Sequence, residues 1–308
     1  AGRRMPPKEK RFSSATGGGR PWRRFGGWPR LLWRRTFRLW LPLPNMHAIA
    51  LRIRPTSALT SRALPGSILD IATYPFVPPT TLSGWLRRLF WAQKGLLPPD
   101  QREGNTPRFY VLPRRYLPLG AYPVGEWRVH RTHRHGPRAV THSEFSRLRR
   151  EGKPPKGGDL QLHTWEYLLA EEFLGAVLAE KEEDLRRLQG LVGYGAKLGK
   201  EGFAYLEAVG EPLEVRLEEG DAPFTPVRAE AWGGAIQGAY PLYRFRFGEA
   251  EDPDPASPDP SPVIGYEGAY FVLPRGRGLA KGFSLEGRFF AWDLVEFLWA
   301  RASGGSSS

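Results

Sequence analysis

The sequence predicts an α+β fold, and three of its features predict it. Residues 47–54 alternate between two faces, one of which is wholly aliphatic, as expected of a half-buried strand. Residues 80–95 repeat apolar side chains at helical spacing. Further strand patterns occur at 213–217 and 242–247. A strand, a helix and later strands without regular alternation with helices indicate an α+β arrangement.

The segment between Pro78 and Gly95 is the most informative one in the chain. Pro78 and Pro79 end whatever precedes the helix, Thr80 or Thr81 is expected to supply its N-cap oxygen, and Gly95 is expected just after its last turn. Between them the apolar residues fall at i, i+3, i+4, i+7 and i+8, namely Leu82, Trp85, Leu86, Leu89 and Phe90. The pattern predicts a helix with one buried face and an exposed face that carries Arg87, Arg88 and Lys94.

Three later segments have patterns of their own. Residues 105–157 are rich in Pro, Gly and basic residues and have only short apolar runs, which favours a long basic hairpin. Residues 164–189 predict a second helix, because acidic residues lie toward its first half and Arg186 and Arg187 lie near its end. Residues 252–262 contain five Pro and three Asp, which predicts an exposed, extended loop.

The charge of the chain is unevenly distributed. The 308 residues carry a formal net charge of +13, but residues 1–45, 46–157 and 158–308 carry +11, +13 and −11. A uniformly basic, histone-like chain is thereby excluded. The distribution predicts a basic half that faces a polyanion and an acidic half that faces solvent or a basic partner protein.

Composition excludes several classes of site. The chain has no Cys, so it forms no disulfide, iron–sulfur cluster or cysteine-ligated zinc site, and it has no thiol nucleophile. No apolar run is long enough to span a membrane, and arginines interrupt the apolar stretch at 31–44, so a cytoplasmic location without a membrane partner is expected. Few thermolabile residues indicate a thermophilic source or GC-rich codon usage.

The two ends of the sequence differ in composition from the rest. Residues 1–45 are basic and aromatic without a stable period, so they are either an arm that binds nucleic acid or a disordered or non-native extension that precedes Met46. The abrupt change at Met46 favours the extension. Residues 303–308 (SGGSSS) are typical of a flexible tail.

Basic and aromatic residues are interleaved in the middle of the chain, a pattern typical of proteins that hold single-stranded nucleic acid. Any one of these residues is equally well explained as part of a solvated surface. As a set they favour binding, because the second half of the chain is acidic. The RNA-binding candidates are Arg87, Arg88, Lys94, Arg114, Arg115, Tyr116, Trp127, Arg128, Arg131, Arg134, Lys197 and Lys200.

Two of the motifs have competing interpretations. The glycines between Gly193 and Gly202, with Lys197 and Lys200, would let backbone N–H groups approach a phosphate, or they form a plain turn. No Walker motif is present.

The histidine cluster is similarly open. His130, His133 and His135 would serve as metal ligands, as acid–base catalysts on an RNA 2′-OH, or as surface contacts to RNA. Neighbouring arginines repel a cation, which favours RNA contacts and no metal. No cofactor is expected, and the usual hydrolase motifs are absent.

Taken together, these features resemble the RAMP proteins of CRISPR systems. The resemblance rests on the first strand, the tract P-P-T-T-L-S-G-W-L-R at 78–87, the long basic excursion and the glycine-rich element. The closest similarity is to family five of the CRISPR-associated proteins, the subunit at the 5′ end of the guide RNA. The glycine-rich loop usual near the C-terminal end of RAMPs is matched imperfectly, either by 193–202 or by 276–282.

The resemblance implies a ferredoxin-like, RRM-related domain with a protruding β-hairpin thumb and a β-rich C-terminal region. Such a subunit binds the 5′ handle of the crRNA, contacts the backbone and large subunits of an effector complex, and meets target DNA only indirectly. The implied organisation is an extension at 1–45, a RAMP domain at 46–248 with its thumb at 105–157, a loop at 249–262, a C-terminal segment at 263–302 and a tail at 303–308.

Two rival functions follow from the same residues. Some members of the family cleave repeat RNA, so a metal-independent endoribonuclease that uses His130, His133 or His135 is the first alternative. The second is a basic accessory protein that binds duplex DNA outside CRISPR systems.

Overall fold

The computed structural model describes residues 45–64, 67, 69–99, 102–103, 106–137, 146–147, 150–152 and 160–299, all within one compact unit. The expected extension (apart from Asn45) and the expected tail at 303–308 lie outside the described residues. The fold is mixed α+β and consists mostly of strands, as the sequence predicts. No helix in the described part of the chain is long and apolar enough to cross a membrane.

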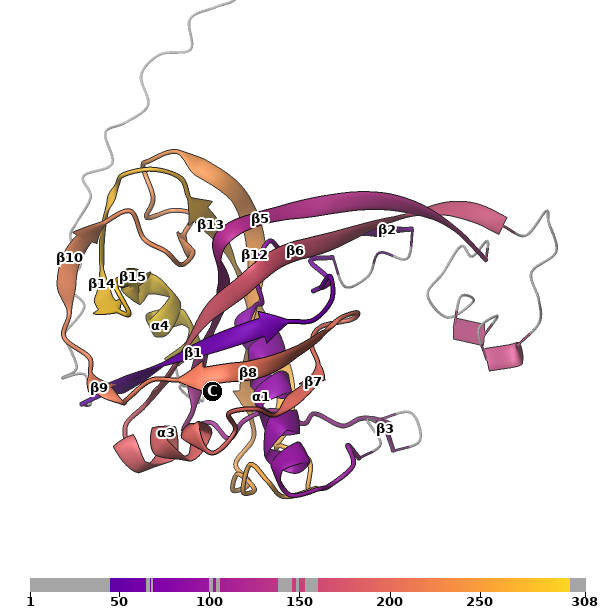
Figure 1. Ribbon diagram of the computed structural model, residues 1–308, viewed down its shortest axis with the longest axis horizontal. Helices are drawn as coiled ribbons and strands as arrows, with labels where there is room; N and C mark the ends of the chain where they lie inside the picture. The colour runs from indigo at the N-terminus through magenta and orange to yellow at the C-terminus, as the bar shows by residue number, and fades with distance from the viewer. Residues whose placement is uncertain are drawn as a thin grey trace, which may run out of the picture. The chain divides into compact units, whose positions relative to one another are not determined.

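One antiparallel sheet organises the fold (Figure 1). Its strands, in spatial order, are β5 (Leu117–Pro137), β6 (Leu160–Ala179), β1 (His47–Pro55), β8 (Phe203–Val209) and β7 (Gly195–Lys197). Each neighbouring pair in this order is antiparallel. Two short strands join the sheet: β2 (Asp70–Ile71) runs parallel to β6, and β9 (Leu213–Glu214) pairs with β1. The strand predicted at 47–54 is confirmed as β1.

Two helices cover one face of this sheet. The helix predicted at 80–95 is confirmed as α1 (Pro79–Gln93), but the expected threonine cap is wrong, because the N-cap residue is Pro78 and no side chain caps the helix. The second is α3 (Glu182–Gln189). Their apolar side chains form one core with the aliphatic face of β1, whose Ile49, Leu51 and Ile53 are fully buried.

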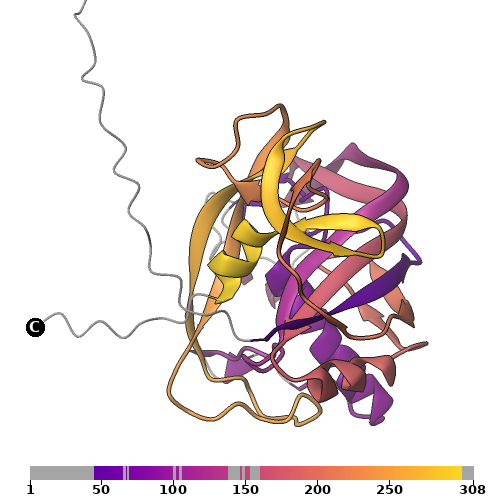
Figure 2. The same ribbon diagram turned by 90° about the vertical axis from the view of Figure 1, so that its left-hand side faces the viewer.

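The C-terminal half packs against the other face of the sheet (Figure 2). It contains one three-stranded sheet of β10 (Glu218–Asp221), β14 (Leu279–Leu285) and β15 (Arg288–Ala291), and another of β11 (Val227–Arg228), β13 (Val263–Pro274) and β12 (Ile236–Phe247). Helix α4 (Trp292–Trp299) follows, and a hairpin of β3 (Arg102–Glu103) and β4 (Thr106–Pro107) lies apart. The strand predicted at 242–247 is confirmed within β12, whereas only the start of 213–217 is a strand.

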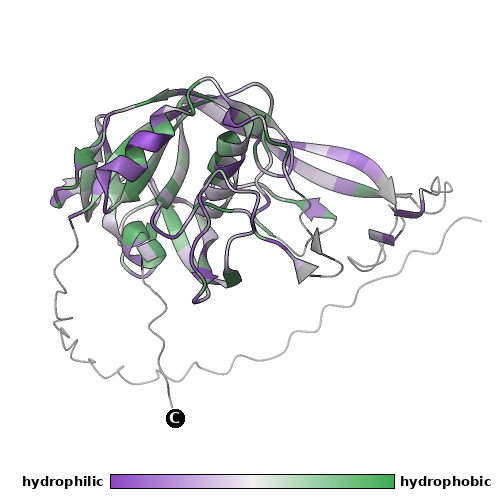
Figure 3. Cartoon of the chain, turned by 90° about the horizontal axis from the view of Figure 1, so that it is seen from below, coloured by the Kyte–Doolittle hydropathy of each residue, from purple (hydrophilic) through white to green (hydrophobic). Residues whose placement is uncertain are grey.

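The long basic excursion is a two-stranded ribbon made of β5 and β6. The strands pair continuously from Trp127 with Ala170 to Pro137 with Leu160. This part extends away from the sheet, and purple hydrophilic residues occur along it in Figure 3. The hairpin expected within 105–157 therefore exists, but its first strand begins at Leu117 and its second lies beyond residue 157.

The helix predicted at 164–189 is wrong over most of its length. Residues up to Ala179 belong to β6, and only Glu182–Gln189 are helical. The inner part of β6 lies between β5 and β1 and is buried on both faces, with Phe173 in one core and Leu174 in the other. A strand buried on both faces has apolar residues on both sides, so its sequence does not alternate between polar and apolar residues. Its near-continuous apolar run therefore also matches the spacing expected of a helix.

The Pro/Asp-rich loop at 252–262 is not simply exposed. The indole N–H of Trp91 on α1 donates to the Ser257 carbonyl oxygen at 2.9 Å. The Ser261 side chain is buried and hydrogen-bonds the backbone of Val111. The loop therefore forms a strap across α1, and we refer to residues 252–261 as the strap.

Candidate nucleic-acid interface

Cationic and aromatic side chains converge on one face of the ribbon formed by β5 and β6. The Arg134 guanidinium carbon lies 4.7 Å from the centre of the Trp165 ring, and the Lys200 Nζ lies 4.6 Å from it. Tyr167 stacks beside Trp165, with an angle of 18° between the rings and 6.4 Å between their centres. We call Arg134, Trp165, Tyr167 and Lys200 the junction cluster.

The β-ladder explains why these residues share a face. Arg134 pairs with His163, and His130 pairs with Tyr167, without a bulge between them. Directly paired residues, and residues two apart along a strand, point to the same side. The face that carries Trp165 therefore also carries Arg128, His130 and Arg134.

The glycine-rich segment supplies the other half of the cluster. The Lys200 N–H donates to the Thr60 carbonyl oxygen at 2.7 Å. A Cβ on Gly199, whose φ is +75°, would lie 2.6 Å from the same oxygen. These glycines bring the loop close to protein backbone, and the N–H of Lys200 is already used. The structure thus favours the turn over the phosphate loop, and the turn presents Lys200 to the ribbon.

Glu201 fixes the geometry of the cluster. Its carboxylate accepts a hydrogen bond from the Tyr167 hydroxyl at 3.1 Å and forms an ion pair with Arg134 at 3.5 Å. Both ends of that ion pair are partly exposed, at 46% and 38% of their side-chain surface. The cluster is therefore held in place while Arg134 stays exposed and Lys200 partly exposed.

Arg87 is a clear correction. The sequence predicts it on an exposed face, yet its side chain is fully buried. It donates to the carbonyl oxygens of Val111, Ser257 and Asp259 and to the Ser261 hydroxyl. Burial lowers its pKa, and the nearby strap carboxylates partly offset this effect. Because the strap covers this face of α1, Arg87 is structural and inaccessible to RNA.

The other two candidates predicted on this helix, Arg88 and Lys94, are less buried than Arg87. Arg88 is half-buried, directs its guanidinium to the Lys197 carbonyl oxygen at 3.5 Å, and has its pKa lowered by burial. Lys94 is exposed after the end of α1, and Lys197 is exposed on β7. Within the described residues neither lysine makes an ion pair, so both are accessible to an anion.

Arg114, Arg115 and Tyr116 lie elsewhere, beside the start of β5. Arg114 pairs with Asp252 of the strap at 3.2 Å, and Arg115 pairs with Asp184 at 2.9 Å. Tyr116 is only 3% exposed. The prediction that its ring stacks on a base is therefore wrong, because the core covers it.

The remaining ribbon candidates lie on two opposite faces. Arg128 is exposed on the cluster face, whereas Trp127 is half-buried and packs against the core. Arg131 lies on the other face and pairs with Glu166 at 2.7 Å, and this hydrogen bond raises its pKa.

The predicted histidines divide in the same way. His130 is on the cluster face, while His133 and His135 are on the opposite face, because they are an odd number of residues away along the strand. His130 and His133 therefore do not form an acid–base pair. No group of metal-ligating side chains occurs among the residues that the structure describes.

The expected separation of charge between the two halves is also wrong. Acidic residues of the second half pair directly with basic residues of the first, as in Arg54 with Glu207 at 2.9 Å and Arg114 with Asp252. Folding interleaves the halves, so the net charges of the halves do not define separate surfaces. What distinguishes the cluster face is local: it combines cations with partly exposed aromatic rings.

Sequence reasoning missed Trp165 and Tyr167 because both lay in the expected helix. The alternation Trp165-Glu166-Tyr167, with aromatic residues of high strand propensity, was the available signal.

A scan against protein-family models finds no match, and no curated protein matches the chain at a significant level.

Proposed function

We propose that this protein is a non-catalytic RNA-binding subunit of a CRISPR interference complex, which binds the 5′ handle of the crRNA through the junction cluster. The observation that carries the proposal is the convergence of Arg134 and Lys200 on one partly exposed tryptophan. Rings and guanidinium planes stack on splayed bases, and cations neutralise phosphates.

The topology supports the ferredoxin-like RAMP assignment. The strand order β5–β6–β1–β8, with α1 after β1 and α3 after β6, is that of a split βαβ pair. In this assignment the ribbon is the thumb that contacts the backbone subunit. The proposed partners are the crRNA and the backbone and large subunits, with target DNA met indirectly, in the cytoplasm.

The roles proposed for the individual cations follow from their accessibility. Arg128 on the cluster face and Lys197 on β7 make no ion pairs with the described residues and would contact phosphates. Arg134 is held on Trp165 and would offer its guanidinium plane to a base. Such contacts position RNA without reading every base.

The decisive experiment measures binding of single-stranded handle RNA by fluorescence anisotropy. The paired variant Arg134→Gln, Lys200→Gln is expected to lose affinity about 10- to 100-fold. The control variant Arg216→Gln, Arg275→Gln removes the same charge from exposed positions outside the ribbon and the junction cluster. Equal losses in both variants, or a preference for duplex DNA, would contradict the proposal.

Two further observations test the complex and the chemistry. The native assembly isolated from cells should contain small RNAs that share one 5′ handle, and an assembly without RNA would refute the CRISPR assignment. Labelled repeat RNA incubated with the protein and EDTA should stay intact. A cut product that disappears in His130→Ala or His133→Ala would instead identify the endoribonuclease.

A further inference from the structure

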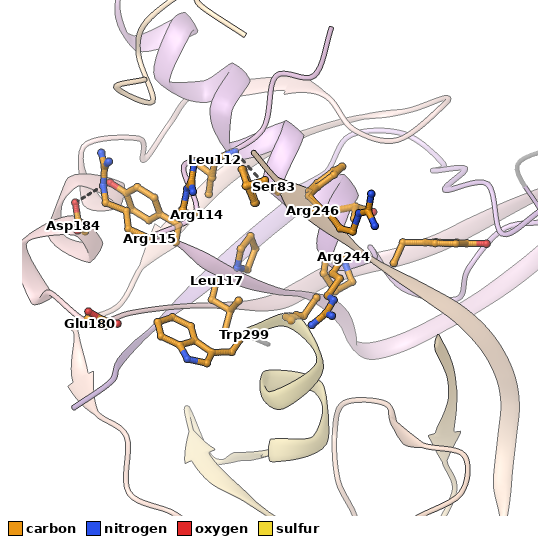
Figure 4. Close-up of a pocket in the computed structure, with 18 of the residues that line it drawn as sticks. Ser83, Leu112, Arg114, Arg115, Leu117, Glu180, Asp184, Arg244, Arg246 and Trp299 are labelled. Atoms are coloured by element: carbon orange, nitrogen blue, oxygen red, sulfur yellow. Dashed lines mark hydrogen bonds and ion pairs between the residues drawn. The ribbon is translucent and has the colours of Figure 1, made fainter. Parts of the chain in front are cut away.

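A cavity of about 590 Å³ lies away from the junction cluster. Its walls come from the segment 112–118, the start of α3, the outer strand β12 and the end of α4 (Figure 4). We propose that this cavity binds a nucleoside phosphate, either as a free nucleotide or as the phosphate-bearing end of a nucleic acid. The proposal does not depend on the function proposed for the ribbon.

The charge of the lining favours an anion. The lining includes two acidic side chains, Glu180 and Asp184, and five cationic ones: Arg114, Arg115, Lys181, Arg244 and Arg246. In Figure 4, Arg115 with Asp184 and Arg244 with Arg246 lie on opposite sides of the cavity. Positive side chains therefore face the space from more than one direction.

Three of the arginines are held by neighbouring groups. Arg114 pairs with Asp252, Arg115 with Asp184 and Arg244 with Glu267, and the first and last also donate to the carbonyl oxygens of Ala250 and Phe297. Lys181 and Arg246, in contrast, make no ion pair with any described residue and are exposed. Fixed guanidinium groups with two uncommitted cations beside them suit a phosphate.

The rest of the lining is aromatic. Tyr243, Phe245 and Phe247 alternate with Arg244 and Arg246 along β12, and the Arg114 guanidinium already covers Phe247 at 5.3 Å. Trp299 ends α4, is only partly buried, and Figure 4 shows its indole beside the cavity. The Trp299 ring is therefore the aromatic face that would stack on a planar base.

The combination selects the ligand class. Inorganic phosphate alone would leave the aromatic part of the cavity empty, and an uncharged ring would leave Lys181 and Arg246 without an anion. The volume is in the range of small-molecule sites, about 300 to 1,000 Å³. A nucleoside phosphate satisfies the charge, the rings and the size together.

Isothermal titration calorimetry of the full chain tests the proposal with adenosine 5′-monophosphate, adenosine and inorganic phosphate as probes. The monophosphate should bind at least about tenfold more tightly than either fragment. Arg246→Gln and Trp299→Ala should each weaken it about tenfold, and Arg275→Gln should not. No binding of the monophosphate, or equal binding to wild type and Arg246→Gln, would overturn the proposal.

A second binding experiment distinguishes a free nucleotide from the phosphate-bearing end of a nucleic acid. It uses the variant Arg134→Gln, Lys200→Gln, in which RNA binding to the ribbon is weakened. Preference for 5′-phosphorylated over 5′-hydroxyl single-stranded RNA, lost in Arg246→Gln, identifies a nucleic-acid end. Tighter binding of the free monophosphate than of either RNA identifies a nucleotide. RNA binding to the ribbon is measured separately, so failure at one site is distinguishable from failure at the other.

Discussion

Two arginine–tryptophan pairs in this protein have similar geometry and opposite environments. Arg87 lies over Trp91 at 5.5 Å, and Arg134 lies over Trp165 at 4.7 Å. The first pair is covered by the strap, where carbonyl and hydroxyl oxygens accept hydrogen bonds from both terminal nitrogens of the guanidinium. The second is open to solvent with one long ion pair to Glu201. The comparison teaches that a cation–aromatic pair is a candidate binding site only where the cation keeps donors that are not already used within the protein.

The largest effect is expected at the buried pair. Arg87→Met should lower the free energy of unfolding by roughly 3–5 kcal/mol, because several buried oxygen acceptors lose their donor at once. Urea denaturation monitored by tryptophan fluorescence measures it. A change below about 1 kcal/mol would show that the strap contributes little.

At the open pair the expected effect is on binding. Trp165→Ala should weaken single-stranded RNA by about 1–3 kcal/mol, since it removes the ring on which both cations rest. Its unfolding free energy should change less than that of Arg87→Met. RNA titrations at two salt concentrations give the affinity and the number of phosphates neutralised. Unchanged affinity would remove Trp165 from the interface.

A smaller effect is expected at Tyr116, which neither pair uses. Its hydroxyl is buried without a hydrogen-bond partner in the described structure, and burial raises its pKa. Tyr116→Phe removes an unsatisfied polar group and should leave stability equal or raise it by about 1 kcal/mol. Thermal unfolding checks this. A clear loss of stability would mean that the hydroxyl has a partner.

The smallest expected effect is the pH dependence of stability that arises from Asp254 in the strap. Burial opposes the ionisation of Asp254, but the Ala256 N–H and Arg187 outweigh it and hold its pKa below the usual 3.8. The folded state then gains stability from this carboxylate above that value and loses it as pH falls further. Because the ion pair between Asp254 and Arg187 is half-exposed, it raises the free energy of unfolding by only about a few tenths of a kcal/mol. Asp254→Asn should be less stable than wild type near about pH 6, and the gap should close below about pH 3.

Local patterns predicted part of the structure well. Strand β1 and helix α1 follow directly from alternation and helical spacing, and proline marks the start of α1. The inner part of strand β6 could not be recognised, since its pairing with β1 and β5 depends on residues far away in the chain, whereas the alternation at 165–167 was an available signal for its outer part. The same reason hid the burial of Arg87, because Ser257 and Asp259 are distant in sequence. Arg134 and Lys200 were predicted, but not the tryptophan that joins them.

The strap also has a consequence for the order of folding. Arg87 and its partner Ser261 are separated by 174 residues. During synthesis α1 leaves the ribosome long before the strap that covers it. Until the strap is made, the Arg87 guanidinium lies on an incomplete core. Contacts of such long sequence separation form slowly. Closure of the strap should therefore be among the last steps of folding, and a nascent chain halted before residue 252 should remain protease-sensitive around α1.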